Sequence, residues 1–189
     1  TATNDVIDLV GIEVYKKALE AYNDANIADE HKDFIYAIRY PIAVNAYRLH
    51  APSNDLAHTN NGRKMRQDDG EKQAFQWMID SDNAALEKRY YRALDDLIKF
   101  LDRSKVETEN AQTLYTIWTN SEAFKATHEL MIRTVKEFDT VFPINSRLLL
   151  LKLAPGISDC EQYEIRPRVG DEKLTALRTK LKSNTALTD

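Results

Sequence analysis

The stretch EKQAFQWMIDSDNAALEKRYYRALDDLIKFLDR, from Glu71 to Arg103, decides the fold of this chain. Its large apolar residues recur at intervals of three and four, which is the spacing of an amphipathic helix. They are Phe75, Met78, Ile79, Leu86, Tyr90, Ala93, Leu94, Leu97, Ile98 and Leu101. No glycine or proline interrupts the stretch, and at roughly 1.5 Å per residue the helix is about 50 Å long. A helix longer than a small domain is wide requires other elements to pack along it.

The composition favours helices throughout. The chain has 189 residues, of which 43% are hydrophobic and 30% charged, with only 5 Gly and 5 Pro. So few turn-forming residues argue against the many tight turns of an all-β sandwich. We predict a single all-α domain over residues 1–189, with about six helices packed around the long helix at 71–103. Two small cores that share this helix are the alternative.

Two helices are expected before the long one. Gly11 interrupts a first capped segment, and a clear amphipathic helix runs from Ile12 to Tyr22. A second pattern runs from Asp29 to about Leu49 with Pro41 inside it. We expect a kink there and not a break, because the apolar spacing continues on both sides.

Shorter helices are expected after it. Residues 111–118 are a short candidate, and Asn120 or Ser121 caps a helix that reaches Phe142. A helix that starts after Ser146 is expected to end at Pro155-Gly156, and residues 159–165 add one turn before Pro167. A final amphipathic helix begins at about Asp171.

Residues 51–70, APSNDLAHTNNGRKMRQDDG, lack helical periodicity. Asn61-Gly62 is a turn signal, and the next residues suit an extended arm or a hairpin strand. A loop of about twenty residues inside a compact domain is usually functional or bound to a partner. The candidate partner contacts are Asn61, Gly62, Arg63, Lys64, Met65 and Arg66.

The formal net charge of the chain is −4, so the chain as a whole has no general attraction to polyanions such as nucleic acid. Residues 166–182 are locally basic. A solvated helix face is the favoured interpretation, and an anion-binding surface is the alternative. The anion contacts would then be Arg178, Lys180 and Lys182.

Searches for catalytic chemistry find little. The four histidines form no HExxH pair, no glycine-rich loop carries the Lys-Ser/Thr of a P-loop, and no serine sits in a G-x-S-x-G elbow. A metal held by His50, Asp55 and His58 is a weaker alternative to solvation. His128 lies on an apolar stripe, which favours a partly buried, hydrogen-bonded side chain. We therefore expect no enzyme, no catalytic residue, no metal, no cofactor and no small-molecule substrate.

Residues 89–92, Arg-Tyr-Tyr-Arg, combine bases with aromatics, as single-stranded nucleic-acid sites do. The simpler interpretation places Tyr90 on the buried stripe with both arginines outward. Six other aromatics are expected to be core residues or interface anchors and not a cofactor cage: Trp77, Trp118, Tyr36, Tyr40, Tyr47 and Tyr115.

The single cysteine, Cys160, excludes an internal disulfide and suits a reducing compartment. We expect it to be a small buried hydrophobe. The longest apolar run, from Leu148 to Leu151, is far too short to span a bilayer, so no membrane partner is expected.

Two short segments of the chain are alike. VGIEVYKKAL from Val10 and VGDEKLTALR from Val169 share Val-Gly-x-Glu before a helix. Each also has an apolar residue, Val6 or Ile165, five places before the glycine. The similarity leaves open whether the chain is part of a longer or tandem-repeat protein.

Three segments carry a family resemblance. They are YPIAVNAYRLHAPSNDLAHTNNGRKMRQDDGEKQAFQWMI, RYYRALDDLIKFLD and FPINSRLLLLKLAPGISDCEQYEIRPRVGDEKL. Together they resemble uncharacterised proteins encoded in phages and prophages of gut Bacteroidales. That family is similar in character to head-to-tail connector, or neck adaptor, proteins of the virion.

The resemblance implies a structural role. Many copies would form a ring through which DNA passes, in contact with other virion proteins, after assembly in the bacterial cytoplasm. The long helix would be a rigid spoke, and the loop at 51–70 would clasp a neighbouring subunit. The alternative is an intracellular helical binding module that touches nucleic acid through residues 166–182.

Overall fold

The computed structural model describes residues 1–24, 27, 29–54, 56–59, 62–65, 75–103 and 114–182. The chain divides into two compact units, Thr1–Phe100 and Leu101–Asp189. The boundary falls inside the long helix, so that helix contributes to both units. We predicted one domain, with two small cores sharing the helix as the alternative.

The predicted all-α class is confirmed. The helices are α1 (Ala2–Val10), α2 (Ile12–Asn23), α3 (Asp29–Asn54), α4 (Gln76–Arg103), α5 (Leu114–Thr119), α6 (Glu122–His128), α7 (Val135–Asp139), α8 (Arg147–Cys160), α9 (Arg166–Val169) and α10 (Asp171–Lys182). A π-helical turn, η1 (Glu161–Ile165), lies between α8 and α9. The described residues therefore form more helices than the six or so expected, because the C-terminal half is divided into short pieces.

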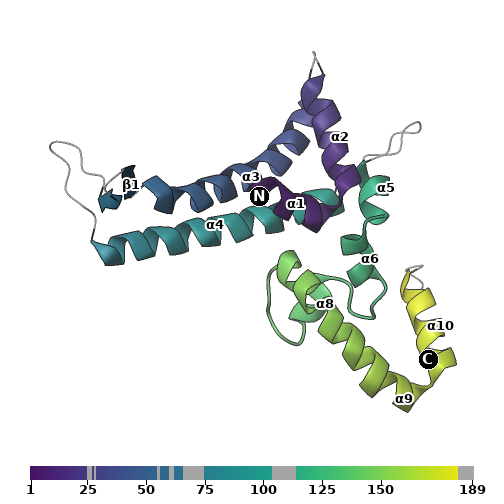
Figure 1. Ribbon diagram of the computed structural model, residues 1–189. Coiled ribbons are helices and arrows are strands. Elements are labelled where there is room, and N and C mark those ends of the chain that lie inside the picture. The colour runs from purple at the N-terminus through teal and green to yellow at the C-terminus, as the bar shows by residue number, and fades with distance from the viewer. Residues whose placement is uncertain are drawn as a thin grey trace. The chain divides into compact units, whose positions relative to one another are not determined.

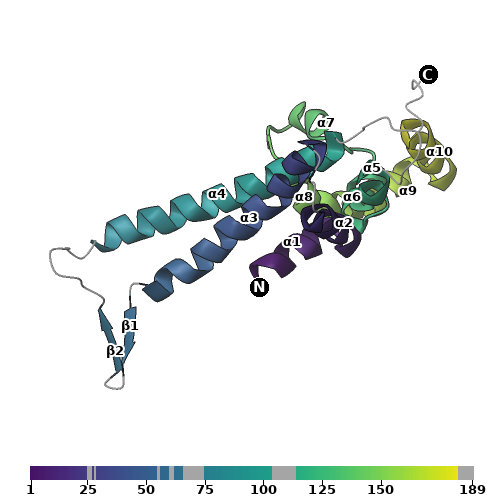
Figure 2. The same cartoon turned by 90° about the horizontal axis from the view of Figure 1, so that it is seen from above.

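In the first unit, α3 and α4 run side by side in opposite directions (Figure 1 and Figure 2). The rings of Phe34 and Phe100 stack with centroids 6.3 Å apart, and the guanidinium of Arg48 lies 5.4 Å from the centre of the Tyr90 ring. The side of α4 that faces this unit buries the predicted stripe. Its buried members are Leu86, Tyr90, Ala93, Leu94, Leu97 and Ile98.

The first turn of α4 departs from this pattern. Phe75 and Met78 belong to the same apolar stripe in sequence, yet they are 69% and 45% exposed. The apolar spacing therefore extends to residues at the start of α4 that no other described element of this unit buries. Residues 71–74, where we expected the helix to begin, lie outside the described residues.

Helices α1 and α2 pack on α3 and join at Gly11, whose φ of 89° suits only glycine at low cost. We call α1, Gly11 and α2 the first elbow. Its apolar side is buried at Val6, Val10, Val14 and Ala18. The polar tie to α3 is a hydrogen bond of 2.7 Å from Nδ2 of Asn45 to the carboxylate of Asp5.

Helix α3 is continuous through Pro41, in agreement with the prediction that the proline does not split it. It extends to Asn54, so the first residues of the expected loop are helical. Two short strands follow, β1 (Leu56–Thr59) and β2 (Gly62–Met65), paired antiparallel with Leu56 opposite Met65. Of the two alternatives for this segment, the hairpin strand is the one that forms (Figure 2).

In the second unit, Pro155-Gly156 does not end α8, contrary to the prediction. The helix continues to Cys160, passes through η1 and α9, and ends only at Gly170. Buried residues lie on both sides of Pro155, with Ala154 before it and Glu161 after it. Packing of this face outweighs the backbone hydrogen bond that the proline removes.

The helix predicted to run to Phe142 is also interrupted. Ser121 caps α6 as expected, but α6 ends at His128 and α7 begins after Thr134. The buried carboxylate of Glu161 accepts a hydrogen bond of 2.7 Å from the backbone N–H of Met131. Thr134 and Glu137 then form a capping box that starts α7. These side-chain contacts satisfy the backbone where the helix is broken.

A buried polar network holds the second unit together. The carboxylate of Asp102 accepts hydrogen bonds from Nε1 of Trp118 at 2.8 Å and from Nε of Arg147 at 2.9 Å. Arg147 also donates to Oγ1 of Thr127 at 2.8 Å. The end of α4 is thereby fixed to α5, α6 and α8.

His128 agrees with the prediction of a partly buried, hydrogen-bonded side chain. Its Nδ1 lies 3.0 Å from the carbonyl oxygen of Phe124, and its ring stacks on the Phe124 ring. Burial lowers the pKa of His128 below its ordinary value of 6.5, although the hydrogen bond to Phe124 opposes this. Cys160, by contrast, is exposed, and the prediction of burial was wrong. It lies at the end of α8 on the exposed side of the helix.

Candidate functional site

An exposed row of tyrosines runs along α3. Tyr36, Tyr40 and Tyr47 lie at i, i+4 and i+11, with Ala43 at i+7, so they share one side of the helix. Tyr36 is 65% exposed and Tyr47 is 58% exposed, and the rings of Tyr36 and Tyr40 stack 5.4 Å apart. We call these four residues the tyrosine stripe. Over three helical turns it presents an apolar surface about 16 Å long.

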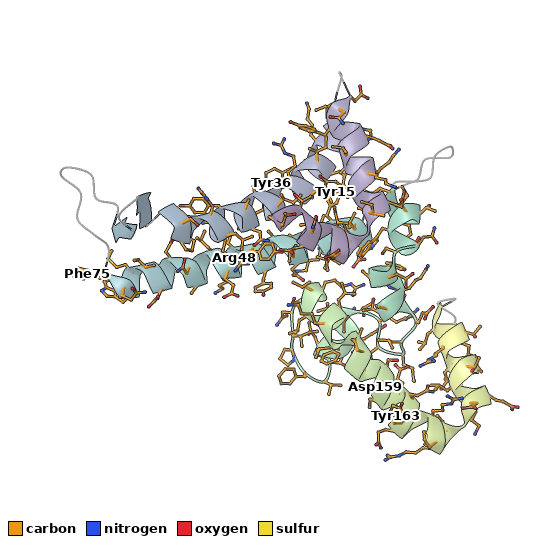
Figure 3. The ribbon with its side chains drawn as sticks, viewed as in Figure 1. Tyr15, Tyr36, Arg48, Phe75, Asp159 and Tyr163 are labelled. Carbon is orange, nitrogen blue, oxygen red and sulfur yellow. The ribbon has the colours of Figure 1, made fainter. Side chains whose placement is uncertain are left out.

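A hollow lies on the α2 side of the stripe. It has a volume of about 390 Å³ and is lined by Tyr22, Ile35, Arg39 and stripe residues among others. The guanidinium of Arg39 lies over the Tyr22 ring at 4.8 Å, which fixes the wall that these two residues form. Tyr36, labelled on α3 in Figure 3, is one of the residues that line this hollow.

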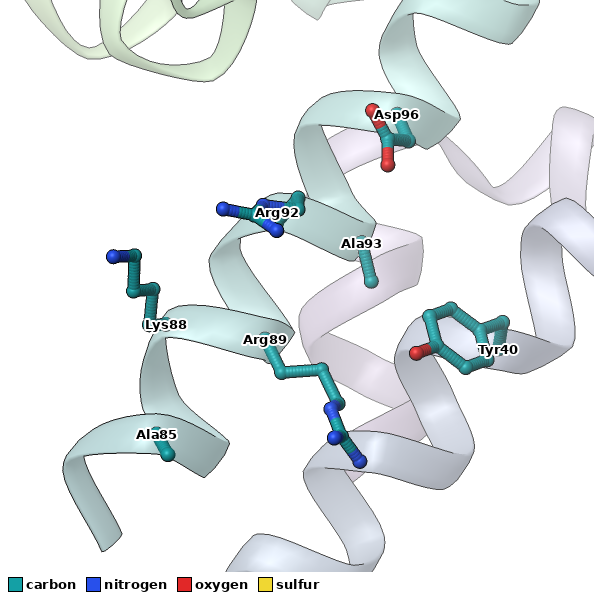
Figure 4. A pocket seen from close by; sticks show the side chains of 7 residues that line it. All are labelled: Tyr40, Ala85, Lys88, Arg89, Arg92, Ala93 and Asp96. Atoms are coloured by element: carbon teal, nitrogen blue, oxygen red, sulfur yellow. The ribbon is translucent and has the colours of Figure 1, made fainter. Parts of the chain in front are cut away.

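A second hollow, of about 400 Å³, separates the stripe from α4. Tyr40 forms one wall, and the other is formed by Ala85, Lys88, Arg89, Arg92, Ala93 and Asp96 (Figure 4). The side chain of Arg89 extends toward the helix that carries Tyr40, whereas Lys88 and Arg92 project outward. Tyr40 therefore borders both hollows, whereas Tyr36 and Ala43 line only the one on the α2 side.

We call Lys88, Arg89 and Arg92 the basic cluster. All three are exposed, and within the described part of the chain none of them has an ion pair. Asp96 is the acidic residue that lines the same hollow. The surface beside the tyrosine stripe is therefore locally positive although the whole chain carries −4.

Tyr90 is buried, and Arg89 and Arg92 are both exposed, which confirms the simpler interpretation of residues 89–92. The tryptophans divide: Trp118 is fully buried, and Trp77 is 68% exposed. Trp77 adjoins the exposed Phe75 and Met78 at the start of α4, where Figure 3 labels Phe75. An apolar patch therefore also exists at the end of the helical pair from which the hairpin extends.

The partner contacts predicted from the sequence lie in or next to that hairpin. Gly62, Arg63, Lys64 and Met65 form β2, with Arg63 opposite His58 on β1. Asn61 and Arg66 lie outside the described residues. Their role in partner contact stays a prediction.

The basic residues predicted as anion contacts have a different environment. Nη2 of Arg178 donates to the buried Glu161 carboxylate at 2.6 Å, so this guanidinium holds α10 to η1. Arg166 is paired with Asp171, and Arg168 with Glu164 at 3.1 Å. Pairing within the fold uses much of the positive charge of residues 166–182. Lys180 and Lys182 stay predicted contacts, and the side chain of Lys182 is outside the description.

The described residues present neither a metal-binding cluster nor a membrane-spanning helix. No group of three or more His, Cys, Asp or Glu side chains there is arranged to hold a metal ion. Asp55, one member of the alternative set with His50 and His58, lies outside the described residues. No helix in the described ranges combines the length and apolar character needed to cross a bilayer.

Sequence reasoning did not single out the tyrosine stripe as a surface, and it named Arg89 and Arg92 of the basic cluster only as the weaker, nucleic-acid alternative for residues 89–92. The spacing of Tyr36, Tyr40 and Tyr47 is visible in the sequence, but helical spacing alone does not distinguish a buried side from an exposed one. The decisive fact is that the buried side of α3 is formed by other residues, among them Phe34, Ile38 and Asn45.

Comparisons with known proteins identify the family to which the chain belongs. No curated protein and no solved structure matches this chain. One family model, described as "Family of unknown function (DUF6712)", matches residues 6–127, which is more than half of the chain and includes α3, α4 and the hairpin between them. The chain therefore belongs to the DUF6712 family of unknown function.

Proposed function

We propose that this chain is a non-enzymatic structural protein of a phage-type particle, a head-to-tail connector or adaptor subunit that assembles into an oligomeric ring. In this proposal α3 and α4 form an arm, and the tyrosine stripe on the arm contacts a neighbouring subunit. The observation that carries the proposal is the stripe itself, because three tyrosines share one side of α3 and the rings of Tyr36 and Tyr47 are mostly exposed.

The residue types of the arm surface support a protein interface. Tyrosine and arginine are the residues that most often dominate the binding energy of protein interfaces, while isolated surface aromatics elsewhere need no explanation. Here three tyrosines share one side of α3 and stand beside Arg39 and Arg89. Tyr40 lies between two hollows, and a complementary helix or loop can fill them.

The proposal that the particle is a phage virion rests on the resemblance of the sequence to phage proteins similar in character to connectors. The partners would be further copies of the chain and other virion proteins, after assembly in the bacterial cytoplasm. A mildly acidic chain suits a ring through which DNA passes, because net negative charge gives no general affinity for the polyanion. The hairpin at β1 and β2 would extend the arm toward the neighbouring subunit.

A double substitution in the stripe tests the proposal. Tyr36→Ala with Tyr47→Ala removes the two most exposed rings and leaves the buried side of α3 unchanged. We expect self-association to weaken by about 100-fold, as for the loss of interface hot spots. Light scattering over a concentration series measures the association, and circular dichroism checks the fold.

Leu49→Ala is the matched control. Leu49 is 54% exposed on the same helix, but its position at i+13 from Tyr36 places it nearly opposite the stripe. It should leave association unchanged. Equal association of the wild type and the double variant would remove the stripe from the interface and contradict the proposal.

The basic cluster favours a second candidate function, a binding module for a polyanion such as nucleic acid. Three exposed cations beside the Tyr40 ring provide charge and a stacking surface. This candidate predicts binding to a DNA oligonucleotide with a steep salt dependence, which Lys88→Gln, Arg89→Gln and Arg92→Gln together would flatten. Lys180→Gln with Lys182→Gln tests the C-terminal alternative in the same assay. Salt-insensitive or absent binding would exclude both.

A further inference from the structure

The hairpin that extends the arm has two free edges. Strands β1 and β2 form a sheet of two strands, paired antiparallel from Leu56 opposite Met65 to Thr59 opposite Gly62. Each strand uses one edge for the other strand, and no further strand in the described part of the chain pairs with its outer edge. An outer edge of this kind presents a row of unpaired N–H and C=O groups to which another chain can bind.

Two strands alone do not make a stable sheet. An isolated two-stranded hairpin is only marginally stable in water, and further strands or packing against a helix stabilise it. Strand β1 contacts α3, the helix that precedes it in the chain. Figure 2 nevertheless shows both strands beyond the ends of α3 and α4, so this helical pair does not cover the hairpin. A strand from outside the subunit would supply the missing support.

Charge decides which edges can meet. Strand β2 carries Arg63 and Lys64, whereas β1, Leu-Ala-His-Thr, carries no formal charge at pH 7. Two β2 strands side by side would place like charges opposite each other, which destabilises a sheet. Proteins often protect an edge strand with charged residues, and β1 lacks this protection. The favoured neighbour of β2 is therefore β1 of another copy.

We infer that β1 of each copy pairs with β2 of the next copy, so that the hairpins form one antiparallel sheet around the ring. The inference rests on the proposed function, because it names a backbone contact between neighbouring arms. It adds pairing of strands to the contact that the tyrosine stripe makes.

Pairing of this kind is a contact between two different surfaces, because each copy offers one β1 edge and one β2 edge. Such contacts repeat from copy to copy and close into a ring when the rotation permits. The closed sheet has no edge left, as in a β-barrel. Two β1 strands related by a twofold axis would instead end at a dimer and leave both β2 edges free.

Proline substitutions in β1 test the pairing on the full chain. Proline lacks an N–H, and an edge strand tolerates it only where that N–H faces solvent. Successive N–H groups of a strand point to opposite edges. One of Ala57→Pro and His58→Pro therefore removes a hydrogen bond within the hairpin, and the other removes only the bond to the next copy. Each should weaken self-association by about 10-fold or more, measured by light scattering.

Ala57→Thr and His58→Thr are the matched controls, because they change the same side chains and keep the N–H. Both should associate like the wild type, and circular dichroism should show the same helical content in all four variants. Wild-type association of either proline variant would overturn the inference, because the pairing requires both an intact hairpin and its outward N–H.

Disulfide formation between copies identifies which strands pair. Cys160 is the single cysteine of the chain and is exposed, so serine first replaces it. One chain then carries Ala57→Cys on β1 and another carries Lys64→Cys on β2, so any disulfide joins two copies. Adjacent strands lie about 4.8 Å apart, whereas strands two apart lie roughly 10 Å apart, beyond the reach of a disulfide.

Under mild oxidation, the mixture of the two chains should form disulfide-linked dimers that contain one chain of each kind, identified by mass. Each chain alone should form few. Arg63→Cys and Met65→Cys in place of Lys64→Cys allow for a shift of register by one residue. Efficient dimer formation by the Ala57→Cys chain alone would show that like strands pair and would overturn the inference. Absence of mixed dimers at all three β2 positions would overturn it as well.

The outcomes separate the two proposals. If the wild type associates and the Tyr36→Ala/Tyr47→Ala chain does not, but both proline variants associate normally, the pairing of hairpins fails and the proposed function stands. If the wild type is a monomer at every concentration, the proposed function fails and the inference fails with it.

Discussion

At the scale of residues, Asp102 is the acceptor on which the second unit depends. Its carboxylate binds both the Trp118 indole and the Arg147 guanidinium, and the Arg147 side chain is only 6% exposed. Asp102→Ala would leave a buried cation without its partner, so we expect the free energy of unfolding to fall by about 3 kcal/mol. Asp96→Ala, at an exposed position of the same helix, should cost about 0.5 kcal/mol or less.

Urea denaturation followed by Trp118 fluorescence measures this effect. The chain has two tryptophans, so Trp77→Phe makes Trp118 the only reporter. Adding Arg147→Met to Asp102→Ala should restore part of the lost stability, because it removes the unpaired charge. Equal destabilisation by Asp102→Ala and Asp96→Ala would show that the network does not stabilise the unit.

His128 gives the fold a specific pH dependence. Its pKa is lower in the folded protein than the ordinary value of 6.5, so the unfolded chain binds a proton more readily. The stability contributed by neutral His128 is therefore complete above about pH 6.5 and is lost as the pH falls through the folded pKa.

His128→Gln should remove that contribution. We expect the free energy of unfolding to drop more between pH 7.5 and pH 5.5 in the wild type than in the variant. Urea titrations at the two pH values measure both drops, and the carboxylates common to both chains cancel in the difference. Identical drops would contradict a lowered pKa of His128.

At the scale of elements, two glycines of the second unit should respond to alanine in opposite ways. A Cβ at Gly170 or at Gly156 would meet no atom within 4 Å, so sterics with neighbours do not decide either result. Gly170 has φ 85° and ψ 155°, a backbone conformation that is almost restricted to glycine. Gly156 lies inside α8.

Gly170→Ala should therefore destabilise the protein by about 1–3 kcal/mol. Gly156→Ala should stabilise it by up to about 1 kcal/mol, because alanine is the better helix former and restricts the unfolded chain. Thermal unfolding of the two variants beside the wild type measures both signs. A neutral Gly170→Ala variant would mean that the junction of α9 and α10 does not require a positive φ at this position.

Elements set by local pattern were predictable from the sequence. The stripe of α4, the break at Gly11 and the cap at Ser121 each depend on residues within a few positions. The elements that differ from the sequence prediction depend on contacts between residues far apart in the chain. Glu161 caps the backbone of Met131 from thirty positions away, and burial on both sides of Pro155 keeps α8 intact. No local pattern encodes these contacts.

The candidate site was predictable only in its parts. The sequence shows tyrosines at helical spacing on α3 and three cations on α4, but whether each side is buried depends on how α1, α2 and α4 pack. Likewise, the Val-Gly-x-Glu similarity was visible, while the difference in burial between Val10 and Val169 emerges only from the fold.

At the scale of the whole molecule, the proposed assembly depends on the surface that the first unit exposes. That unit presents the tyrosine stripe on α3. Large exposed aromatics reduce the solubility of a single subunit, and burial in an assembly removes that cost. In the proposed ring, a neighbouring copy covers the stripe.

The hairpin at the end of the arm contributes in this account through its basic strand. Replacing Arg63, Lys64 and Arg66 by alanine should weaken assembly without changing the helical content, because Arg63 and Lys64 belong to β2 and none of the three lies in a described helix. Circular dichroism and light scattering on the same sample check both parts. If the triple variant assembles normally, these three basic residues do not contribute to the contact between subunits.

The most direct test is the mass of the wild-type chain in solution, measured by light scattering over a concentration series and repeated after deletion of residues 52–66. The account predicts one discrete mass that is a multiple of the 21.7 kDa of a single chain and does not grow further with concentration, as a closed ring requires. The deletion should shift the mass toward the monomer. A mass of one chain at every concentration of the wild type would contradict the central claim.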